Sequence, residues 1–281
     1  MKRVCCILLS LLLLLPLCAL SELNEEELEI EEFDADATPA PAEAVWDFPV
    51  ALEDMDPAFV VLANKHYKLD SSFVPDPLVK MKQRKAAKDG SNKNGGVLFA
   101  SGGTYKLQET CAKALVEMSE GARAEGYKLY LKSAYRSYQT QNTMYYNRLK
   151  KNKGKDDGWV SQPGSSDHQT GLGCDVVPRS WRDKAMNGKM GKEPECVWMA
   201  EHCQEYGFIL RYPADKEDVT EINYEPWHMR YVGVPAATYI MENGLCLEEF
   251  TEQLQQAIRD WLDAGGDRSR VEKFIQTPTE E

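Results

Sequence analysis

The excess acidic charge of this chain lies in one stretch near its N-terminus, so this stretch and the rest of the chain cannot fold in the same way. Residues 22–56 contain 14 Asp and Glu, and no Lys or Arg occurs between Arg3 and Lys65. Such a segment repels itself and stays solvated. With these 14 of the 45 acids set aside, and the first two of the 33 bases, 31 of each sign remain. The net charge of −12 therefore comes from the N-terminal part of the chain. We interpret its acidic stretch, residues 22–56, as a solvated tether. The balanced remainder has no basic surface that would indicate nucleic-acid binding.

The N-terminus has the pattern of an export signal. Lys2 and Arg3 precede an apolar run over residues 4–20, as in a secretory signal peptide. Small residues at Ala19 and Ser21 predict cleavage after Ser21, with the position after Ala19 as an alternative. About 17 apolar residues can also just span a bilayer, so a retained anchor stays open. Both alternatives place the protein outside the cell or at its envelope, with membrane contact only through this segment.

These features predict four regions of the chain. Hydrophobic residues make up 43% and charged residues 28%, which is ordinary for a single globular domain of this length. The predicted regions are a signal peptide or anchor (1–21), an acidic linker containing Pro and Ala (22–58), a catalytic domain (59–268) and a C-terminal tail (269–281).

The periodicity of the domain predicts mixed helices and strands. Apolar residues three and four apart predict a helix over 107–124, and the alternation in 128–134 predicts a strand. Further helices are expected over 138–152, 195–206 and 247–264, and further strands over 174–177, 208–212 and 228–232. Since there is no regular alternation of strand and helix, the fold class is α+β with a small, mainly antiparallel sheet and flanking helices.

Cysteine usage gives no structural metal site. Removal of the leader leaves five cysteines, an odd number, so at least one thiol is unpaired within a monomer. None has the CxxC spacing of a zinc site. If Cys196 and Cys203 share a helix, their Cα atoms are about 10 Å apart, too far for a disulfide. The five residues are Cys111, Cys174, Cys196, Cys203 and Cys246.

Two of the four histidines lie among other metal-ligand residues. Asp175 follows His168 by seven residues, and a turn at Gly171 and Gly173 would bring the imidazole and the carboxylate together. His228 would be the second imidazole. Two imidazoles and one carboxylate leave a fourth position for water, as in catalytic zinc sites. His66 and His202 have no such surroundings, and we expect them to lie in the lead-in segment and on a solvent-facing helix.

Glu225 stands three residues before His228 and is a spare carboxylate. Pro226 between them favours an extended or turned backbone. Zinc brings the pKa of water to about 7, so a neighbouring carboxylate can take its proton near neutral pH. We therefore expect Glu225 to act as the general base.

In four separated blocks, the sequence resembles the VanY-type D-alanyl-D-alanine carboxypeptidases, a group related to lysostaphin-type peptidases and hedgehog domains. The resemblance spans roughly residues 59–250 and implies a fold of the hedgehog/DD-peptidase type. The blocks are Ser133-Ala134-Tyr135-Arg136-Ser137-Tyr138, the residues from His168 to Asp175, Tyr206-Gly207-Phe208-Ile209-Leu210-Arg211-Tyr212-Pro213, and Tyr224-Glu225-Pro226-Trp227-His228-Met229-Arg230-Tyr231-Val232-Gly233.

The resemblance implies a role for each matching residue. Zn²⁺ would be held by His168, Asp175 and His228, with Glu225 as the catalytic base. Arg136 matches an arginine that engages the substrate near the scissile bond, for which a planar, permanently charged guanidinium is suited. Ser166, Asp167 and Gln169 would line the site, and Tyr224 and Trp227 could flank the substrate, although a structural role for Trp227 is as consistent with the sequence.

The sequence departs from the family at Gly173 and Cys174, where relatives more often have Ala and an aliphatic residue. Both residues are small, so packing should survive the change. A thiol beside a proposed ligand could touch metal. Alternation in a strand points Cys174 and Asp175 to opposite faces, so we expect Cys174 to face inward and be inert.

The expected activity is removal of the terminal D-alanine from peptidoglycan stem peptides ending in D-Ala-D-Ala. An L,D-carboxypeptidase or a cell-wall endopeptidase would use the same zinc residues with a different pocket. A zinc-containing binding domain without turnover is a further alternative, against which Glu225 and Arg136 count. We expect a monomer.

Overall fold

The structure is a computed structural model that describes residues 44–85 and 87–279. The predicted signal segment (1–21) and residues 22–43 of the predicted linker lie outside the described residues. Among the residues that are described, no helix is both long enough and apolar enough to cross a membrane.

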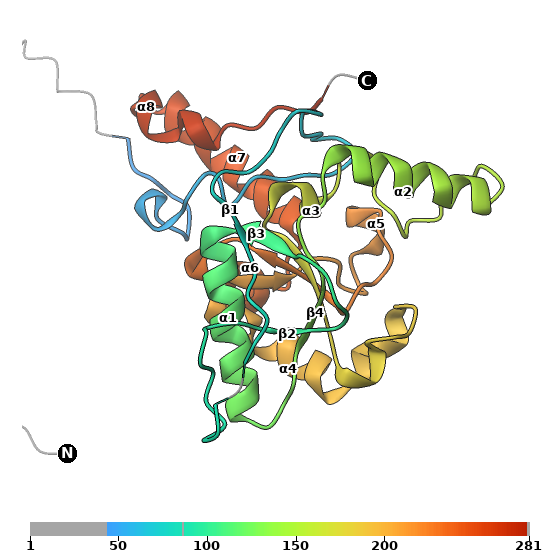
Figure 1. The fold of residues 1–281 in the computed structure, drawn as a ribbon. Helices are drawn as coiled ribbons and strands as arrows, with labels where there is room; N and C mark the ends of the chain where they lie inside the picture. The colour runs from blue at the N-terminus through green and yellow to red at the C-terminus, as the bar shows by residue number, and fades with distance from the viewer. Residues whose placement is uncertain (1–43, 86, 280–281) are drawn as a thin grey trace, which may run out of the picture. The chain divides into compact units, whose positions relative to one another are not determined.

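A five-stranded sheet forms the centre of the domain (Figure 1). Its strand order is β2-β4-β5-β7-β6. β2 pairs with β4 in parallel, and the other three pairings are antiparallel. A separate pair, β1 and β3, is antiparallel. The predicted α+β class with a mainly antiparallel sheet is confirmed. The strands are β1 (Leu78–Lys80), β2 (Leu98–Phe99), β3 (Lys106–Gln108), β4 (Tyr130–Ser133), β5 (Gly173–Val177), β6 (Phe208–Leu210) and β7 (His228–Tyr231).

The helices include every long one that the periodicity predicts. The predicted helix over 195–206 ends in a 3-10 turn, η4 (Cys203–Tyr206). Four shorter helices, α3, α5, α6 and α8, were not predicted. The α-helices are α1 (Glu109–Ala124), α2 (Tyr138–Lys151), α3 (Asp167–Thr170), α4 (Pro194–His202), α5 (Glu217–Thr220), α6 (Val234–Glu242), α7 (Leu247–Asp263) and α8 (Arg268–Val271). The other 3-10 turns are η1 (Leu52–Asp54), η2 (Arg179–Trp181), η3 (Gly188–Lys192) and η5 (Glu272–Phe274).

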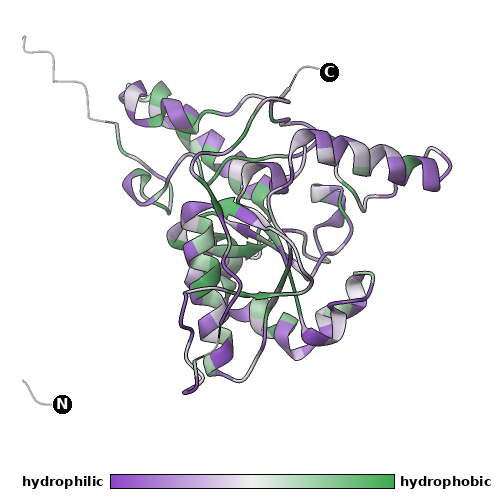
Figure 2. Cartoon of the chain, in the orientation of Figure 1, coloured by the Kyte–Doolittle hydropathy of each residue, from purple (hydrophilic) through white to green (hydrophobic). Residues whose placement is uncertain are grey.

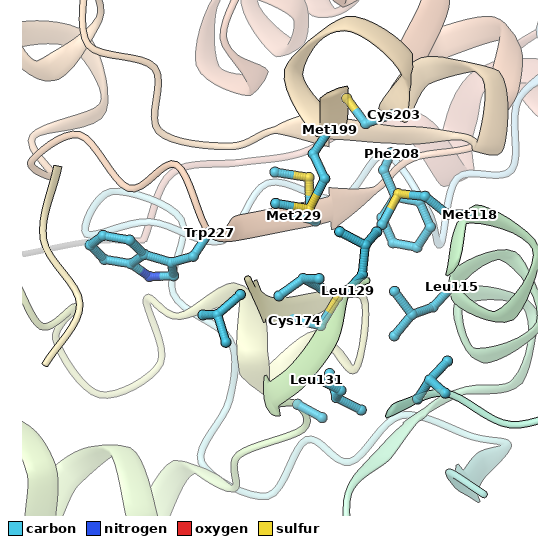
Figure 3. Packing of buried hydrophobic residues seen from close by; sticks show 14 of the residues in the cluster. Leu115, Met118, Leu129, Leu131, Cys174, Met199, Cys203, Phe208, Trp227 and Met229 are labelled. Atoms are coloured by element: carbon cyan, nitrogen blue, oxygen red, sulfur yellow. The ribbon is translucent and has the colours of Figure 1, made fainter. Parts of the chain in front are cut away.

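One hydrophobic cluster packs α1 and α4 against the sheet. Leu115 and Met118 of α1 lie one helical turn apart and are fully buried. They face Phe208 of β6 and Cys174 of β5 in the same cluster (Figure 3). Because alternate residues of β5 point to opposite faces of the sheet, the neighbour of Cys174 is left free to point away from this core.

A second cluster packs the apolar face of α7 against α6, and against side chains from residues 44–62 and 271–275. Trp46 and Phe48 contact Trp261 and Phe250 edge to face. Residues 44–58, predicted to belong to the linker, therefore pack on the domain. Val50, Leu52 and Met55 are buried, and Trp46 and Phe48 are half-buried. Val271 and Phe274 are also buried, so the predicted C-terminal tail packs on the domain as well.

α2 differs from the other long helices because it has no buried apolar residue. Gln141 is its one buried residue. Ser137 caps its first turn by accepting a hydrogen bond from the Thr140 amide, and basic residues occupy the last turn, where they suit the helix dipole. The helix extends away from the sheet and is largely hydrophilic (Figures 1 and 2). Polar contacts therefore hold this helix: the Ser137 cap and Gln141 at its first turn, and the ion pair of Arg148 with Asp157 in its last turn.

Candidate metal centre

A tight turn between α3 and β5 sets up the centre. Gly171 ends α3 in the left-handed conformation with φ of 70°, which glycine adopts without strain. A Cβ at Gly173 would lie 2.8 Å from the Cβ of Asp167. An alanine there would force the turn apart, which accounts for glycine at this position. The chain thus doubles back at this turn, which brings His168 of α3 close to Asp175 of β5.

Three side chains from this turn and from β7 converge. Asp175 Oδ1 lies 3.4 Å from His168 Nε2 and 3.1 Å from His228 Nδ1. All three ligand atoms lie within 4.8 Å of one another, and all three residues are buried. The register of the sheet explains the last contact, because Asp175 of β5 and His228 of β7 are directly paired. Residues 53 positions apart in the sequence are thereby brought together.

The donor set fits a zinc ion. His168 Nδ1 lies 2.7 Å from the Ala134 carbonyl, so Nδ1 carries the proton and donates, and Nε2 keeps a free lone pair. Burial and the nearby Arg136 lower the pKa of His168, which favours the neutral imidazole that a metal requires. Ligands about 2.0–2.1 Å from a tetrahedral zinc are about 3.3 Å apart, close to the separations of Asp175 Oδ1 from the two imidazoles.

Cys174 does not take part in this cluster. It is fully buried in the core on the opposite face of β5 (Figure 3). Burial raises the pKa of its thiol well above the usual value, so the thiolate that would bind metal is disfavoured. The prediction that Cys174 faces inward is confirmed. All five cysteines among the described residues are free.

Glu225 stands beside the three converging side chains. Its backbone N–H donates to the Tyr212 carbonyl, and its own carbonyl accepts from the His228 N–H, which fixes the turn through Pro226. Glu225 Oε2 lies 3.7 Å from His228 Nδ1. Burial and the charge of Asp175 raise the pKa of Glu225 well above its usual range, while Arg136 opposes the shift. A carboxyl group in this setting can accept and return a proton.

Arg136 is held rigidly at the same cavity. Its Nη1 donates to Gln141 Oε1 at 2.7 Å and its Nη2 to Ser133 Oγ at 3.2 Å. Gln141 in turn donates to the Ser161 carbonyl at 2.6 Å. The amide of Gln141 therefore orients the guanidinium without changing its charge. Burial lowers the pKa of Arg136, and the carboxylates of Asp175 and Glu225 offset only part of this shift.

One cavity of about 420 Å³ is lined by His168, Asp175, His228, Glu225 and Arg136. Of the other predicted site residues, Ser166 and Trp227 also line it, and Trp227 stacks on Trp159 with the ring planes 14° apart. Tyr224 does not line the cavity, because its ring lies over Gly188 and Gly191. His66 and His202 are likewise elsewhere, in contact with Glu221 and Glu205.

Asp167 and Gln169, which the sequence predicts to line the site, do not line this cavity. Gln169 is fully buried, and its amide donates to the Asp70 carbonyl at 2.9 Å. Asp167 bonds Arg211 and Arg230, both fully buried. Burial would raise the pKa of Asp167, but the two guanidinium groups outweigh it and hold the pKa at about 2. Arg211 also forms two bonds to Glu248 at the start of α7.

Sequence reasoning missed three residues that shape the cavity. Tyr212 packs its ring 5.0 Å from that of His228, Trp159 stacks on Trp227, and Gln141 holds Arg136. Tyr212 stands in one of the blocks that carry the family resemblance, and that position was the available signal. Gln141 is five residues after Arg136, at the start of α2, where a polar residue gives no sign of burial.

The chain is similar to known carboxypeptidases in sequence and in structure. A family profile described as VanY, D-alanyl-D-alanine carboxypeptidase, matches residues 104–234. The chain is 36% identical over 198 residues to YodJ of Bacillus subtilis, which is named as a carboxypeptidase, and the match covers 70% of this chain and 68% of YodJ.

Two solved structures are also similar. The LdcB LD-carboxypeptidase matches with a TM-score of 0.60 and 36% identity, over 70% of this chain and 87% of the other. The D,D-pentapeptidase VanY of a VanB-type resistance cassette, solved with Zn(II), matches with a TM-score of 0.51 and 27% identity, over 69% and 98%. The matches agree in fold and differ in the bond that their names specify.

Proposed function

Since the chain belongs to the VanY family of D-alanyl-D-alanine carboxypeptidases and is a metallopeptidase, we propose that it removes the terminal D-alanine from peptidoglycan stem peptides. One observation carries the proposal. His168, Asp175 and His228 converge in one cavity that Glu225 and Arg136 also line. A site for metal, a buried proton acceptor and a fixed cation are the parts needed to hydrolyse a peptide bond beside a free carboxylate.

The three converging residues would hold Zn²⁺. When bound, the metal supplies a Lewis acid that polarises the peptide carbonyl and lowers the pKa of water toward neutrality. The fit of two imidazoles and one carboxylate, with the His168 tautomer fixed by the Ala134 carbonyl, supports zinc over a harder cation that prefers only oxygen ligands.

Glu225 takes a proton from the attacking water and later gives it to the departing amine. It can serve in both steps because its carboxyl group is buried beside the three proposed ligands. Arg136 orients the C-terminal carboxylate of the substrate, or stabilises the negative charge that develops on the carbonyl oxygen. Its bonds to Gln141 and Ser133 hold it in place beforehand, so little reorganisation is needed.

An L,D-carboxypeptidase is the second candidate. The observation that favours it is the similarity to the LdcB structure, which has the higher TM-score of the two structures described above. The metal residues and Glu225 would act identically, and the pocket for the residue before the scissile bond would decide the outcome. Either activity acts on peptidoglycan, so we propose that the protein acts at the cell envelope. We also propose that its N-terminal segment exports it and that it is active as a monomer.

The test is mass spectrometry of defined muropeptides incubated with the purified protein. Release of one D-alanine from a pentapeptide supports the proposal, release of a D-amino acid from a tetrapeptide supports the second candidate, and cleavage of a cross-link indicates an endopeptidase. A chelator should abolish release, and added zinc should restore it. A protein that holds zinc stably but cleaves none of these substrates would contradict the proposal and indicate a binding domain.

A further inference from the structure

The charge of the catalytic domain is balanced as a whole, but it is not evenly distributed. Residues 80–96 contain six Lys and Arg and a single acid, Asp89. Without this segment, residues 65–281 have 25 bases and 30 acids. We call residues 80–96 the lysine loop, which the structure describes except for residue 86. Of its six cations, only Arg84 forms a salt bridge with a described residue. The five others are exposed: Lys80, Lys82, Lys85, Lys88 and Lys93.

Hydrogen bonds within the lysine loop fix the course of its backbone. Asn94 Nδ2 donates to the Gln83 carbonyl at 2.6 Å, and Asn94 Oδ1 accepts from the Lys85 N–H at 3.0 Å. Arg84 Nη2 donates to the Gly90 carbonyl at 2.9 Å. The guanidinium of Arg84 is therefore used within the loop, while the lysines stay in solvent. Because the backbone that carries these lysines is already ordered, a partner pays little entropy to bind them.

A cavity of about 370 Å³ is lined by residues of the lysine loop, α1 and β4, and we call it the loop cavity. Arg84 and Arg123 in its wall both pair with one carboxylate, that of Glu120. The side chain of Arg84 is only 9% exposed. Lys128 also lines the cavity and forms no salt bridge within residues 44–85 and 87–279. Three cations and one acid leave this cavity with an excess of positive charge.

The composition of the lysine loop indicates the kind of partner that it fits. Five exposed ammonium groups are more than one small anion can contact, so a polymer with repeated negative charges suits them better. The loop contains no aromatic residue, and Met81, its one large apolar residue, is buried. It therefore lacks the side chains that insert into a lipid surface or stack on bases. Lysine binds phosphate as a point charge, whereas paired recognition of carboxylates favours arginine.

We propose that the lysine loop and the loop cavity bind a linear phosphodiester polymer of the cell envelope. The exposed lysines pair with successive phosphates, and the loop cavity takes one charged unit of the polymer. Tyr130 lines the loop cavity, and Ser133, three residues further along β4, bonds Arg136. Three residues of a strand span about 10 Å, so the bound polymer lies near the metal cavity but outside it. This surface keeps the enzyme at the wall and takes no part in hydrolysis. The proposal rests on the proposed location at the envelope, and it does not depend on which bond is cleaved.

The test measures binding of the full-length protein to a fluorescently labelled oligomer of glycerol phosphate by anisotropy. The combined substitution Lys85→Gln, Lys88→Gln and Lys93→Gln should raise Kd about tenfold, since each exposed charge pair contributes roughly twofold. An unchanged midpoint of urea unfolding would show that the loop variant is folded. A loop variant that binds the oligomer as tightly as the unmodified protein would overturn the proposal.

The matched control is the combined substitution Lys150→Gln, Lys151→Gln and Lys153→Gln. It removes the same charge from three exposed lysines at the end of α2, which lies far from α1 in Figure 1. The control should change Kd by less than about twofold, the effect of one exposed charge pair. If the control weakens binding as much as the loop variant does, the oligomer responds to the overall charge of the protein, and the proposed site is wrong.

Two competitors with the same number of negative charges identify the polymer. Unlabelled glycerol phosphate oligomer should displace the labelled one more effectively than polyglutamate, and at least as effectively as single-stranded DNA. Equal displacement by polyglutamate would show that phosphate is not preferred, and stronger displacement by DNA would indicate a nucleic-acid site. Either result overturns the proposal. Binding requires neither metal nor turnover, so a protein that binds the oligomer but releases no D-alanine would contradict the proposed function alone.

Discussion

Two buried polar clusters meet at α3, and they differ in how their groups are satisfied. The metal cluster consists of His168, Asp175 and His228, and the ion cluster consists of Asp167, Arg211, Arg230 and Glu248. In the ion cluster, each carboxylate faces a guanidinium within the protein. In the metal cluster, Asp175 Oδ1 lies 3.4 Å and 3.1 Å from the two imidazole nitrogens, and all three donor atoms lie within 4.8 Å of one another. A cation stabilises such an arrangement. Similar burial thus yields a self-contained anchor in one cluster and an unfinished ligand set in the other.

The two clusters are joined through neighbouring residues. Asp167 and His168 are consecutive in α3 yet belong to different clusters, and His228 Nε2 lies 3.9 Å from Asp167 Oδ2. The ion cluster also ties β7 to residues 59–61, through bonds from Arg230 to the Phe59 and Val61 carbonyls. The anchor therefore holds the backbone segments that carry two of the three proposed metal ligands. Substitutions in the two clusters should have different consequences.

The largest effect is expected from His228→Ala. Removal of one of three protein ligands should reduce the zinc content from about one ion per chain to almost none, and turnover should be lost with it. Atomic emission analysis of the purified protein and the D-alanine release assay measure the two quantities. His202→Ala is the control, because that imidazole is paired with Glu205 on the surface. A His228→Ala protein that retains zinc would show that the metal cluster is misassigned.

Glu225→Gln should separate metal binding from chemistry. The substitution keeps the size of the side chain and removes its ability to take a proton, so turnover should fall roughly 10²- to 10⁴-fold. Zinc content should stay unchanged, since Glu225 is outside the set of three ligands. Single-turnover rates and metal analysis test the two statements. Loss of zinc together with activity would instead place Glu225 among the ligands.

The metal cluster was predictable from sequence, whereas the ion cluster was not. His168, Asp175 and His228 are ligand types in distinctive surroundings, and Gly171 indicated the turn between them. Asp167 was assigned to the same site by adjacency alone. Consecutive residues of a helix point about 100° apart, and α3, with four residues, is too short for periodicity to predict. The partners of Asp167 are 44 and 63 residues away, and no local pattern connects them.

The prediction of helices and of the N-terminal segment has the same limit. Apolar periodicity predicted α1 and α7 because each has one buried face. The helix α6 is nine residues long and, unlike α4, is not continued by a 3-10 turn into a longer pattern. The acidic composition around Trp46 and Phe48 concealed two aromatic anchors, because charge density averaged over a segment does not register single side chains that pack against Trp261 and Phe250.

Asp167→Asn should test the anchor. The substitution is nearly isosteric but leaves Arg230 without a carboxylate partner in a buried position. Breaking a buried pair in this way costs about 3–5 kcal/mol of unfolding free energy. Urea unfolding of the metal-free proteins in the presence of a chelator measures it without a contribution from zinc binding. Asp157→Asn is the matched control, since Asp157 pairs with the partly exposed Arg148 and should cost about 1 kcal/mol or less. Equal losses would remove the distinction between an anchoring and a surface ion pair.

The smallest effect is expected from Cys174→Ala, which probes the boundary between the metal cluster and the hydrophobic core. Cys174 is next to Asp175 but lies on the opposite face of β5, fully buried among apolar side chains. Losing one sulfur atom from a packed site should lower the free energy of unfolding by about 1 kcal/mol through the small cavity that remains. Zinc content and turnover should match those of the unmodified protein, because the thiol faces away from the ligands. A drop in zinc affinity without a change in the stability of the metal-free protein would mean that the sulfur reaches the metal, and the alternation of β5 would then no longer separate ligand from core.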